Sequence, residues 1–72
     1  MLHKFTVVII KEKNWYVARS LELGVTSQGK TVKAAEKNLK EAIELYLENE
    51  PELEKRLPKT KPVITTLELN HV

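Results

Sequence analysis

The chain has 72 residues, about half the length of a usual domain, so we expect a single small domain over residues 1–72. It has no cysteine, which excludes disulfides, thiolate metal sites and a cysteine nucleophile. The net charge of +2 gives no strong field that would favour duplex nucleic acid. No stretch approaches the roughly 20 apolar residues of a membrane helix, and the N-terminus lacks a signal-peptide cleavage site, so we expect a cytoplasmic protein.

The charged residues are unusual in kind, because all ten acidic residues are glutamate and ten of the twelve basic residues are lysine. Enrichment in lysine and glutamate without cysteine is reported for thermophile proteins, and it predicts a thermophilic origin. A helix-rich surface in any organism is the alternative explanation.

The first predicted strand covers residues 2–10, which are rich in β-branched and aromatic side chains. Both faces are partly apolar, which is typical of a central strand or of a strand that a partner covers. The two faces carry Phe5, Val7 and Ile9 on one side and Leu2, Val8 and Ile10 on the other.

Two further strands are predicted before the helix. A polar segment over residues 11–14 has hairpin-loop length and leads into a strand over residues 15–20. Gly24 then bends the chain into a short strand over residues 25–28, which ends at Gly29. We expect Gly29 to have a backbone conformation with positive φ, which is costly for residues with a Cβ.

An amphipathic helix is predicted over residues 31–49, with Thr31 as its N-cap and Pro51 just beyond its end. Residues 52–57 are compatible with one further turn, and residues 58–62 form a linker with a proline at each end. The apolar residues of the helix follow helical spacing: Val32, Ala35, Leu39, Ala42, Ile43, Tyr46 and Leu47.

The last predicted strand covers residues 63–69, which completes the order β-β-β-α-β and an α+β fold class. We expect an antiparallel meander of three strands with the helix on one face. A right-handed crossover then places the fourth strand parallel to the first, which makes the first strand central.

Catalytic chemistry is not expected from this sequence, and neither is a metal or a cofactor. The order βββαβ is the front half of the ribonuclease H fold, whose metal site needs a carboxylate on the first strand, but residues 2–10 contain no acid. His3 and His71 are expected near opposite ends of the sheet, so they do not form a pair. Glutamates on the helix are explained by an ordinary solvated face.

A base-stacking platform is a second possibility, built from Trp15, Tyr16 and Arg19 on the second strand. The RNP1 signature is missing from the chain, and Trp15 and Tyr16 are neighbours that point to opposite faces of a strand. We therefore expect one of these aromatic residues in the core and the other at the surface.

The charges along the predicted helix oppose its macrodipole, which favours acids first and bases last. A partner that reads the acidic end is one explanation, and chance is the other. Lys33, Lys37 and Lys40 occupy the first half, whereas Glu41, Glu44, Glu48 and Glu50 occupy the second.

Residues 16–48 resemble the HicB family of antitoxins, through a YVA strand, an acidic-leucine bend, the turn SQGKT and a helix that ends in LYLE. The resemblance implies a truncated ribonuclease-H-like fold without catalysis. It implies self-association, and it implies binding to a HicA-like toxin, a small protein that resembles a double-stranded-RNA-binding domain and cleaves mRNA. Glu41, Glu44 and Glu48 are the residues we expect to contact the toxin, since a surface that holds RNA must be basic.

Two features depart from the family pattern. The bend reads Leu23-Gly24-Val25 instead of Leu-Pro-Gly-Cys, and the chain ends after the predicted fourth strand, without the DNA-binding domain of many members. We therefore expect no direct DNA binding by this chain alone. An orphan oligomeric domain with another small-protein or RNA partner is the alternative function.

Self-association is also predicted from the residues themselves. One helix covers one face of a sheet, so Leu2, Val8 and Ile10 on the other face would be exposed unless another subunit covers them. A homodimer or a higher homo-oligomer is therefore expected.

Overall fold

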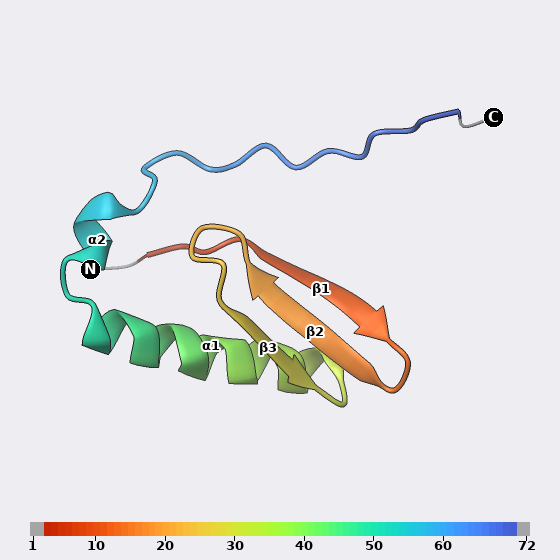
Figure 1. Cartoon of the computed structure of the whole chain (residues 1–72), viewed down its shortest axis with the longest axis horizontal. Helices are drawn as coiled ribbons and strands as arrows, with labels where there is room; N and C mark the ends of the chain where they lie inside the picture. The colour runs from red at the N-terminus through yellow and green to blue at the C-terminus, as the bar shows by residue number, and fades with distance from the viewer. Residues whose placement is uncertain (1–2, 71–72) are drawn as a thin grey trace.

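The computed structural model describes residues 3–70 and shows a three-stranded sheet with one long helix against it (Figure 1). The strand over residues 15–20 and the long helix are close to the predicted ranges, whereas the first strand begins later than predicted. The elements, in chain order, are β1 (Val7–Glu12), β2 (Trp15–Ser20), β3 (Thr26–Gly29), α1 (Val32–Asn49) and α2 (Leu53–Arg56).

The sheet is an antiparallel meander in the order β1-β2-β3, as predicted. Pairing runs from Val7 opposite Ser20 to Glu12 opposite Trp15, so the hairpin turn is shorter than the predicted loop. Lys13 occupies that turn with a φ of 50°, in the left-handed region. The register places Trp15 and Tyr16 on opposite faces of the sheet, which confirms the predicted split between them.

The first strand begins at Val7 rather than at residue 2, because the backbone of Thr6 bonds to the bend after β2. The N–H of Thr6 donates to Glu22 Oε1 at 2.7 Å, and the Thr6 carbonyl accepts from the Leu21 N–H at 2.9 Å. These bonds hold the N-terminal segment on the bend instead of on β2. Phe5 therefore lies outside the strand, whereas Leu2, which was also predicted in it, lies outside the described residues.

The core lies between α1 and one face of the sheet. Its buried apolar residues are Ala18 from β2 and Ala35, Leu39 and Ile43 from α1. The helical spacing of α1 places Ala35, Leu39 and Ile43 on one side, as the sequence predicts, and the alternation of β2 turns Ala18 toward them. Partly buried side chains surround them: Phe5, Val7, Ile9, Tyr16, Leu23, Val25 and Leu47.

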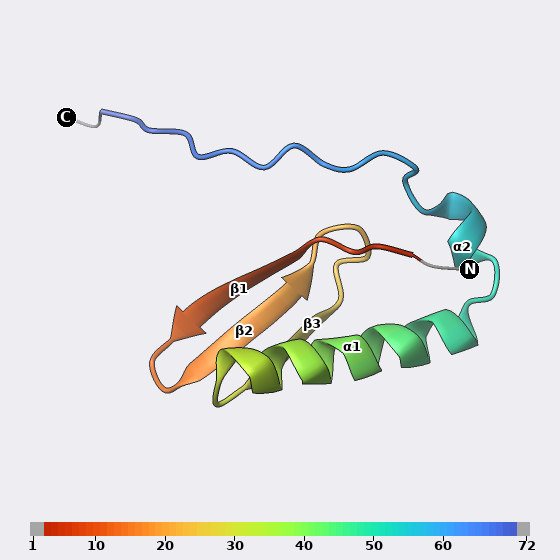
Figure 2. The ribbon, with the colours of Figure 1, turned by 180° about the vertical axis from the view of Figure 1, so that it is seen from behind.

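The helix is not centred over the sheet. It packs mainly against β3 and β2 and only slightly against β1 (Figure 2). Asn38 Nδ2 donates to the carbonyl of Gln28 at 2.9 Å, which ties α1 to β3. The side of β1 that faces away from β2 is therefore left without a helix above it.

The predicted fourth strand over residues 63–69, parallel to the first, is not formed within this chain. Residues 57–70, which we call the C-terminal segment, run in the same general direction as β1 but apart from it, without a strand assignment (Figures 1 and 2). Pro58 and Pro62 lack an N–H and hold φ near −65°, so they favour a stiff, extended linker over one that folds back. As a result β1 is an edge strand, not the predicted central strand.

Candidate functional site

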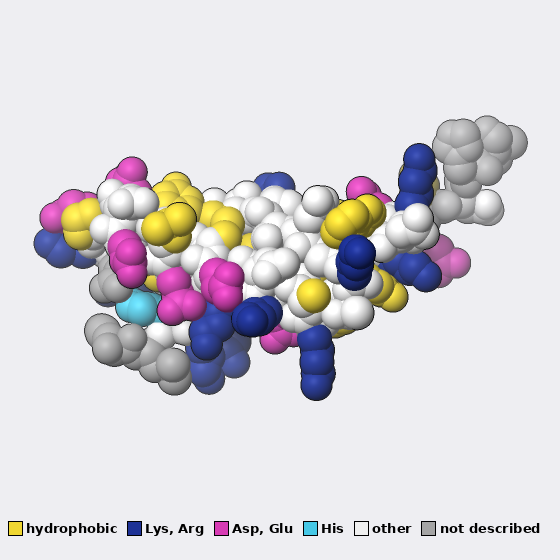
Figure 3. Space-filling view, turned by 90° about the horizontal axis from the view of Figure 1, so that it is seen from below, with side chains coloured by type: hydrophobic (Ala, Val, Ile, Leu, Met, Phe, Trp, Pro, Cys, Tyr) yellow, Lys and Arg dark blue, Asp and Glu magenta, His cyan; other side chains and the backbone are white. Residues whose placement is uncertain are grey.

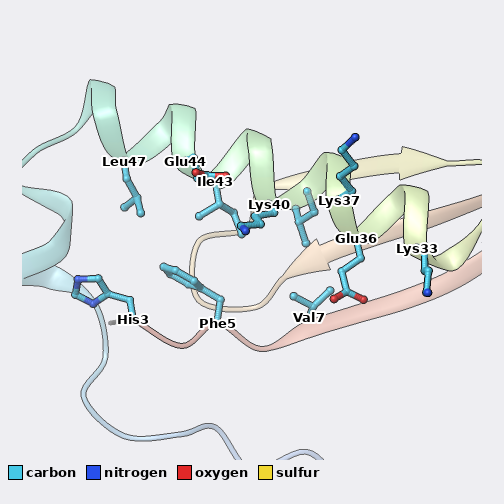
Figure 4. Close-up of a pocket in the computed structure, with 11 residues that line it drawn as sticks. His3, Phe5, Val7, Lys33, Glu36, Lys37, Lys40, Ile43, Glu44 and Leu47 are labelled. Atoms are coloured by element: carbon cyan, nitrogen blue, oxygen red, sulfur yellow. The ribbon is translucent and has the colours of Figure 1, made fainter. Parts of the chain in front are cut away.

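A groove of about 980 Å³ opens between β1 and α1, on the side that the helix leaves uncovered (Figure 4). Phe5 and Val7 form one wall, and Ile43 and Leu47 project from the helix on the other. We call this space the β1–α1 groove. Its other lining residues are His3, Lys33, Glu36, Lys37, Leu39, Lys40 and Glu44.

The groove follows from the position of the helix. The buried stripe of α1 contains Ala35, Leu39 and Ile43, and Leu47 continues it toward the helix end. Because α1 lies over β3 and β2, the edge of this stripe meets open space instead of a strand. An apolar floor that is open to solvent makes this groove a candidate binding surface.

The acidic residues predicted to bind a partner are all exposed, and they share one face of α1. Glu44 lies three residues after Glu41 and four before Glu48, which places them side by side. We call these three residues the acidic helix face. Figure 3 shows acidic side chains gathered over the C-terminal half of α1, at the left of that view. Glu44 also lines the β1–α1 groove, whereas Glu41 and Glu48 do not.

The helix dipole adds negative potential at the Glu48 end of this face. The last turn of α1 contains no basic residue, and its first turn contains no acidic one. The partial negative charge at a helix C-terminus therefore adds to the glutamates instead of being offset. Lys33, Lys37 and Lys40 lie on the groove side of the first half of the helix.

Thr31 begins the helix as predicted. Its Oγ1 accepts a hydrogen bond from the Ala34 N–H at 3.0 Å, and its backbone is extended, with φ −133° and ψ 165°. This satisfies one of the N–H groups that a helix leaves unpaired at its start.

Gly29 is needed at its position, but not for the predicted reason. The glycine with a positive φ is Gly24, at 73°, so the expectation for Gly29 is wrong. A Cβ at Gly29 would instead lie 2.5 Å from Ala35 N and 2.7 Å from Ala34 C. The strand end and the start of α1 approach too closely for any side chain, and only the tertiary packing reveals that approach.

Glu22 anchors the bend to the N-terminal segment. Burial raises the pKa of its carboxyl, but hydrogen bonds from the backbone and side chain of Thr6 and from its own backbone lower the pKa below its usual value. The carboxylate is therefore a structural acceptor for Thr6, which no periodic pattern in the sequence indicates.

A second apolar surface, besides the β1–α1 groove, lies on the face of the sheet that points away from α1, which we call the open sheet face. Val8 and Val17 are half-buried there, Ile10 is 58% exposed and Trp15 is 42% exposed. Of the residues predicted for this face, Leu2 lies outside the described residues. Arg19 shares this face with Trp15, whereas Tyr16 packs against the core, so the three residues do not form one platform.

Within residues 3–70, no group of three or more His, Cys, Asp or Glu side chains is arranged to hold a metal ion. His71, which the sequence predicts to lie far from His3, is outside these residues. Over the same residues, no helix combines the length and apolarity needed to cross a membrane.

Comparison with known proteins identifies a family for this chain but no activity. The family described as "Family of unknown function (DUF7387)" matches residues 3–62, so the chain belongs to it. The match ends at Pro62, just before the apolar part of the C-terminal segment. No curated protein and no solved structure matches the chain.

Proposed function

We propose that this member of the DUF7387 family is an antitoxin that binds a small mRNA-cleaving toxin and covers its RNA-binding surface. The resemblance of residues 16–48 to HicB antitoxins supports the proposal. Those residues include most of β2, the bend, β3 and most of α1, which form the larger part of the sheet and helix.

The acidic helix face is the observation that carries the proposal. Glu41, Glu44 and Glu48 are exposed on one side of α1, and Glu48 lies in the last turn, at the negative end of the helix dipole. A toxin that holds RNA phosphates has a basic surface. Complementary charge would steer the two proteins together and would orient the acidic helix face toward the toxin.

The proposed activity needs binding and no catalysis. A protein that occupies the toxin's RNA-binding surface prevents cleavage sterically, and it acts where the mRNA is, in the cytoplasm. Purified protein with magnesium or manganese should leave RNA, DNA and RNA–DNA hybrids intact. Cleavage that persists through purification and disappears when Glu36 is changed to glutamine would contradict this part of the proposal.

Co-expression tests the proposal directly. The candidate toxin is a small protein that resembles a double-stranded-RNA-binding domain and is encoded beside this gene. Its expression alone should arrest growth, and the 72-residue chain should restore growth. If no neighbouring gene produces a toxic protein, or if growth is not restored, the antitoxin proposal is wrong.

Association rates then test the acidic helix face. The double change Glu44→Lys and Glu48→Lys should slow binding to the toxin by about tenfold at low salt, and it should flatten the salt dependence of the rate. The matched control compares two single charge reversals. Glu48→Lys changes the acidic helix face, whereas Glu12→Lys makes the same change at the exposed end of β1. Equal rates for Glu48→Lys and Glu12→Lys would remove the acidic helix face from the mechanism.

An orphan binding domain is the second candidate function. The open sheet face favours it, because Trp15 and Ile10 are exposed large apolar residues on a surface with Arg19. Under this candidate, Trp15→Ala abolishes binding to a protein or RNA partner, whereas reversal of the acidic helix face leaves it unchanged.

A further inference from the structure

The C-terminal segment carries apolar side chains that contact little of their own chain. Val63 is 91% exposed, Leu67 87% and Leu69 77%. In an extended chain, successive side chains point to opposite faces, so Val63, Thr65, Leu67 and Leu69 share one face. Thr66 and Glu68 lie on the other face with Ile64. This alternation is typical of a strand with one buried face.

The surface that such a strand fits lies beside β1. The outer edge of β1 has no strand partner among the described residues, since the sheet order is β1-β2-β3. The β1–α1 groove opens along this same edge and is lined by the apolar side chains of Phe5, Val7, Ile43 and Leu47 (Figure 4). A strand added to β1 would place every second side chain over this apolar floor.

The exposed area indicates how much surface remains to be covered. The chain exposes 6486 Å², whereas a compact monomer of its mass exposes about 4,600 Å². Its radius of gyration is 14.3 Å, compared with about 11 Å for a compact chain of this length. The excess of about 1,900 Å² exceeds the roughly 800 Å² that each partner buries in a standard interface.

The linker directs the segment away from its own sheet. Residues 57–61 lie beside residues 3–6, where they line a shared cavity, so the segment starts near the beginning of β1. It then runs in the direction of β1 without pairing to it (Figures 1 and 2). Pro58 and Pro62 stiffen the linker, which favours exchange with another copy over closure on the same chain.

We propose that residues 63–69 of one copy pair with the edge of β1 in a second copy, and reciprocally, to form a strand-exchanged homodimer. Val63, Leu67 and Leu69 then fill the partner's β1–α1 groove. A two-fold axis perpendicular to the sheet reverses the strand direction, so the exchanged strand runs antiparallel to β1. At about 3.3 Å per residue the seven residues are long enough to span β1. This inference does not depend on the toxin.

Light scattering on the full chain tests the oligomeric state. At micromolar concentration the native chain should have twice its 8.3 kDa mass, and Leu67→Glu should have the monomer mass. Thr66→Glu is the matched control, because it adds the same charge at the residue just before Leu67, whose side chain points away from the groove. This variant should remain a dimer. Circular dichroism should show the same helix content in all three proteins, since Leu67 lies outside the core.

Engineered cysteines test which chains are joined, because the native sequence has none. Thr66→Cys in one preparation and Val8→Cys in another should form a disulfide-linked heterodimer after mixing, since both side chains lie on the open side of the exchanged sheet. Thr26→Cys, on β3 at the opposite edge, replaces Val8→Cys in the control and should remain unlinked.

Three results would overturn the proposal. If the native chain has the monomer mass, the strands are not exchanged. If the Leu67→Glu variant keeps the dimer mass, the dimer forms through another surface, such as the open sheet face. A disulfide that forms only when Thr66→Cys and Val8→Cys are on the same chain would show closure of the segment on its own sheet.

Discussion

Leu39 on α1 is 1% exposed, whereas Leu67 in the C-terminal segment is 87% exposed, although both residues occur in regular apolar patterns. The packed body, residues 3–49, has a sheet on which the helix can lay its apolar stripe. The C-terminal segment has the alternation of a strand but no neighbouring strand to bond with. A helix satisfies its own backbone hydrogen bonds, whereas a strand needs a neighbouring strand for them. The apolar stripe of α1 is therefore buried, but the apolar side chains of the C-terminal segment stay exposed.

Truncation of the two leucines should give the largest contrast between these regions. Leu39→Ala leaves a cavity in the core and should lower the free energy of unfolding by about 2–5 kcal/mol. Leu67→Ala should change monomer stability by less than about 0.5 kcal/mol, because its side chain is exposed. Urea denaturation at submicromolar concentration measures both values. A large loss for Leu67→Ala under these conditions would mean that the segment packs on its own body.

The two glycines of the body give a second contrast. Gly29→Ala should cost about 1–3 kcal/mol, because its Cβ would collide with the backbone of Ala34 and Ala35. Gly24→Ala should cost about 1 kcal/mol, from its positive φ alone. Gly24→Asn should recover part of that loss, since asparagine tolerates the left-handed region, whereas Gly29→Asn should recover nothing. Unfolding curves that show full rescue at both positions would contradict the collision at Gly29.

The start of α1 should contribute a smaller, local effect. Thr31→Ala removes the acceptor for the Ala34 N–H and should cost about 1 kcal/mol of unfolding free energy. Thr31→Ser keeps the hydroxyl and should stay near the native value. Thermal unfolding followed by circular dichroism measures the difference. Equal melting temperatures for the alanine and serine variants would show that the cap contributes nothing.

Acidic pH should give the smallest effect, and it should be confined to the bend. The folded state lowers the pKa of Glu22, so its carboxylate stabilises the fold above the unfolded-state pKa of about 4.3. This contribution is lost as the pH falls through the lower, folded-state pKa. Glu22→Gln should therefore show a weaker loss of stability over this pH range than the native chain does.

Glu12→Gln is the control for Glu22→Gln, because it removes one charge at an exposed position of the hairpin. It should keep the native pH dependence in this range. Identical denaturation profiles for Glu22→Gln and Glu12→Gln would show that the bond between Thr6 and Glu22 does not contribute to stability.

Local chemistry made much of the body predictable. The spacing from Val32 to Leu47 indicates the helix, Thr31 indicates its start, and the alternation of residues 15–20 indicates β2. The acidic helix face could be proposed for the same reason, since helical spacing alone places Glu41, Glu44 and Glu48 together. The β1–α1 groove could not be predicted, because it depends on how far the helix lies from β1.

The sequence by itself determined the meander, the helix and its cap, and the apolar character of residues 63–69, because each depends on side chains close in the chain. The tertiary structure alone decided three features: why Gly29 must be glycine, that Thr6 pairs with Glu22 rather than with β2, and that residues 63–69 do not pair with their own sheet. Each of these depends on a contact, made or missing, between groups distant in the chain. The physical reason is that strand pairing and close backbone approach are set by the position of neighbouring elements, which local propensity does not encode.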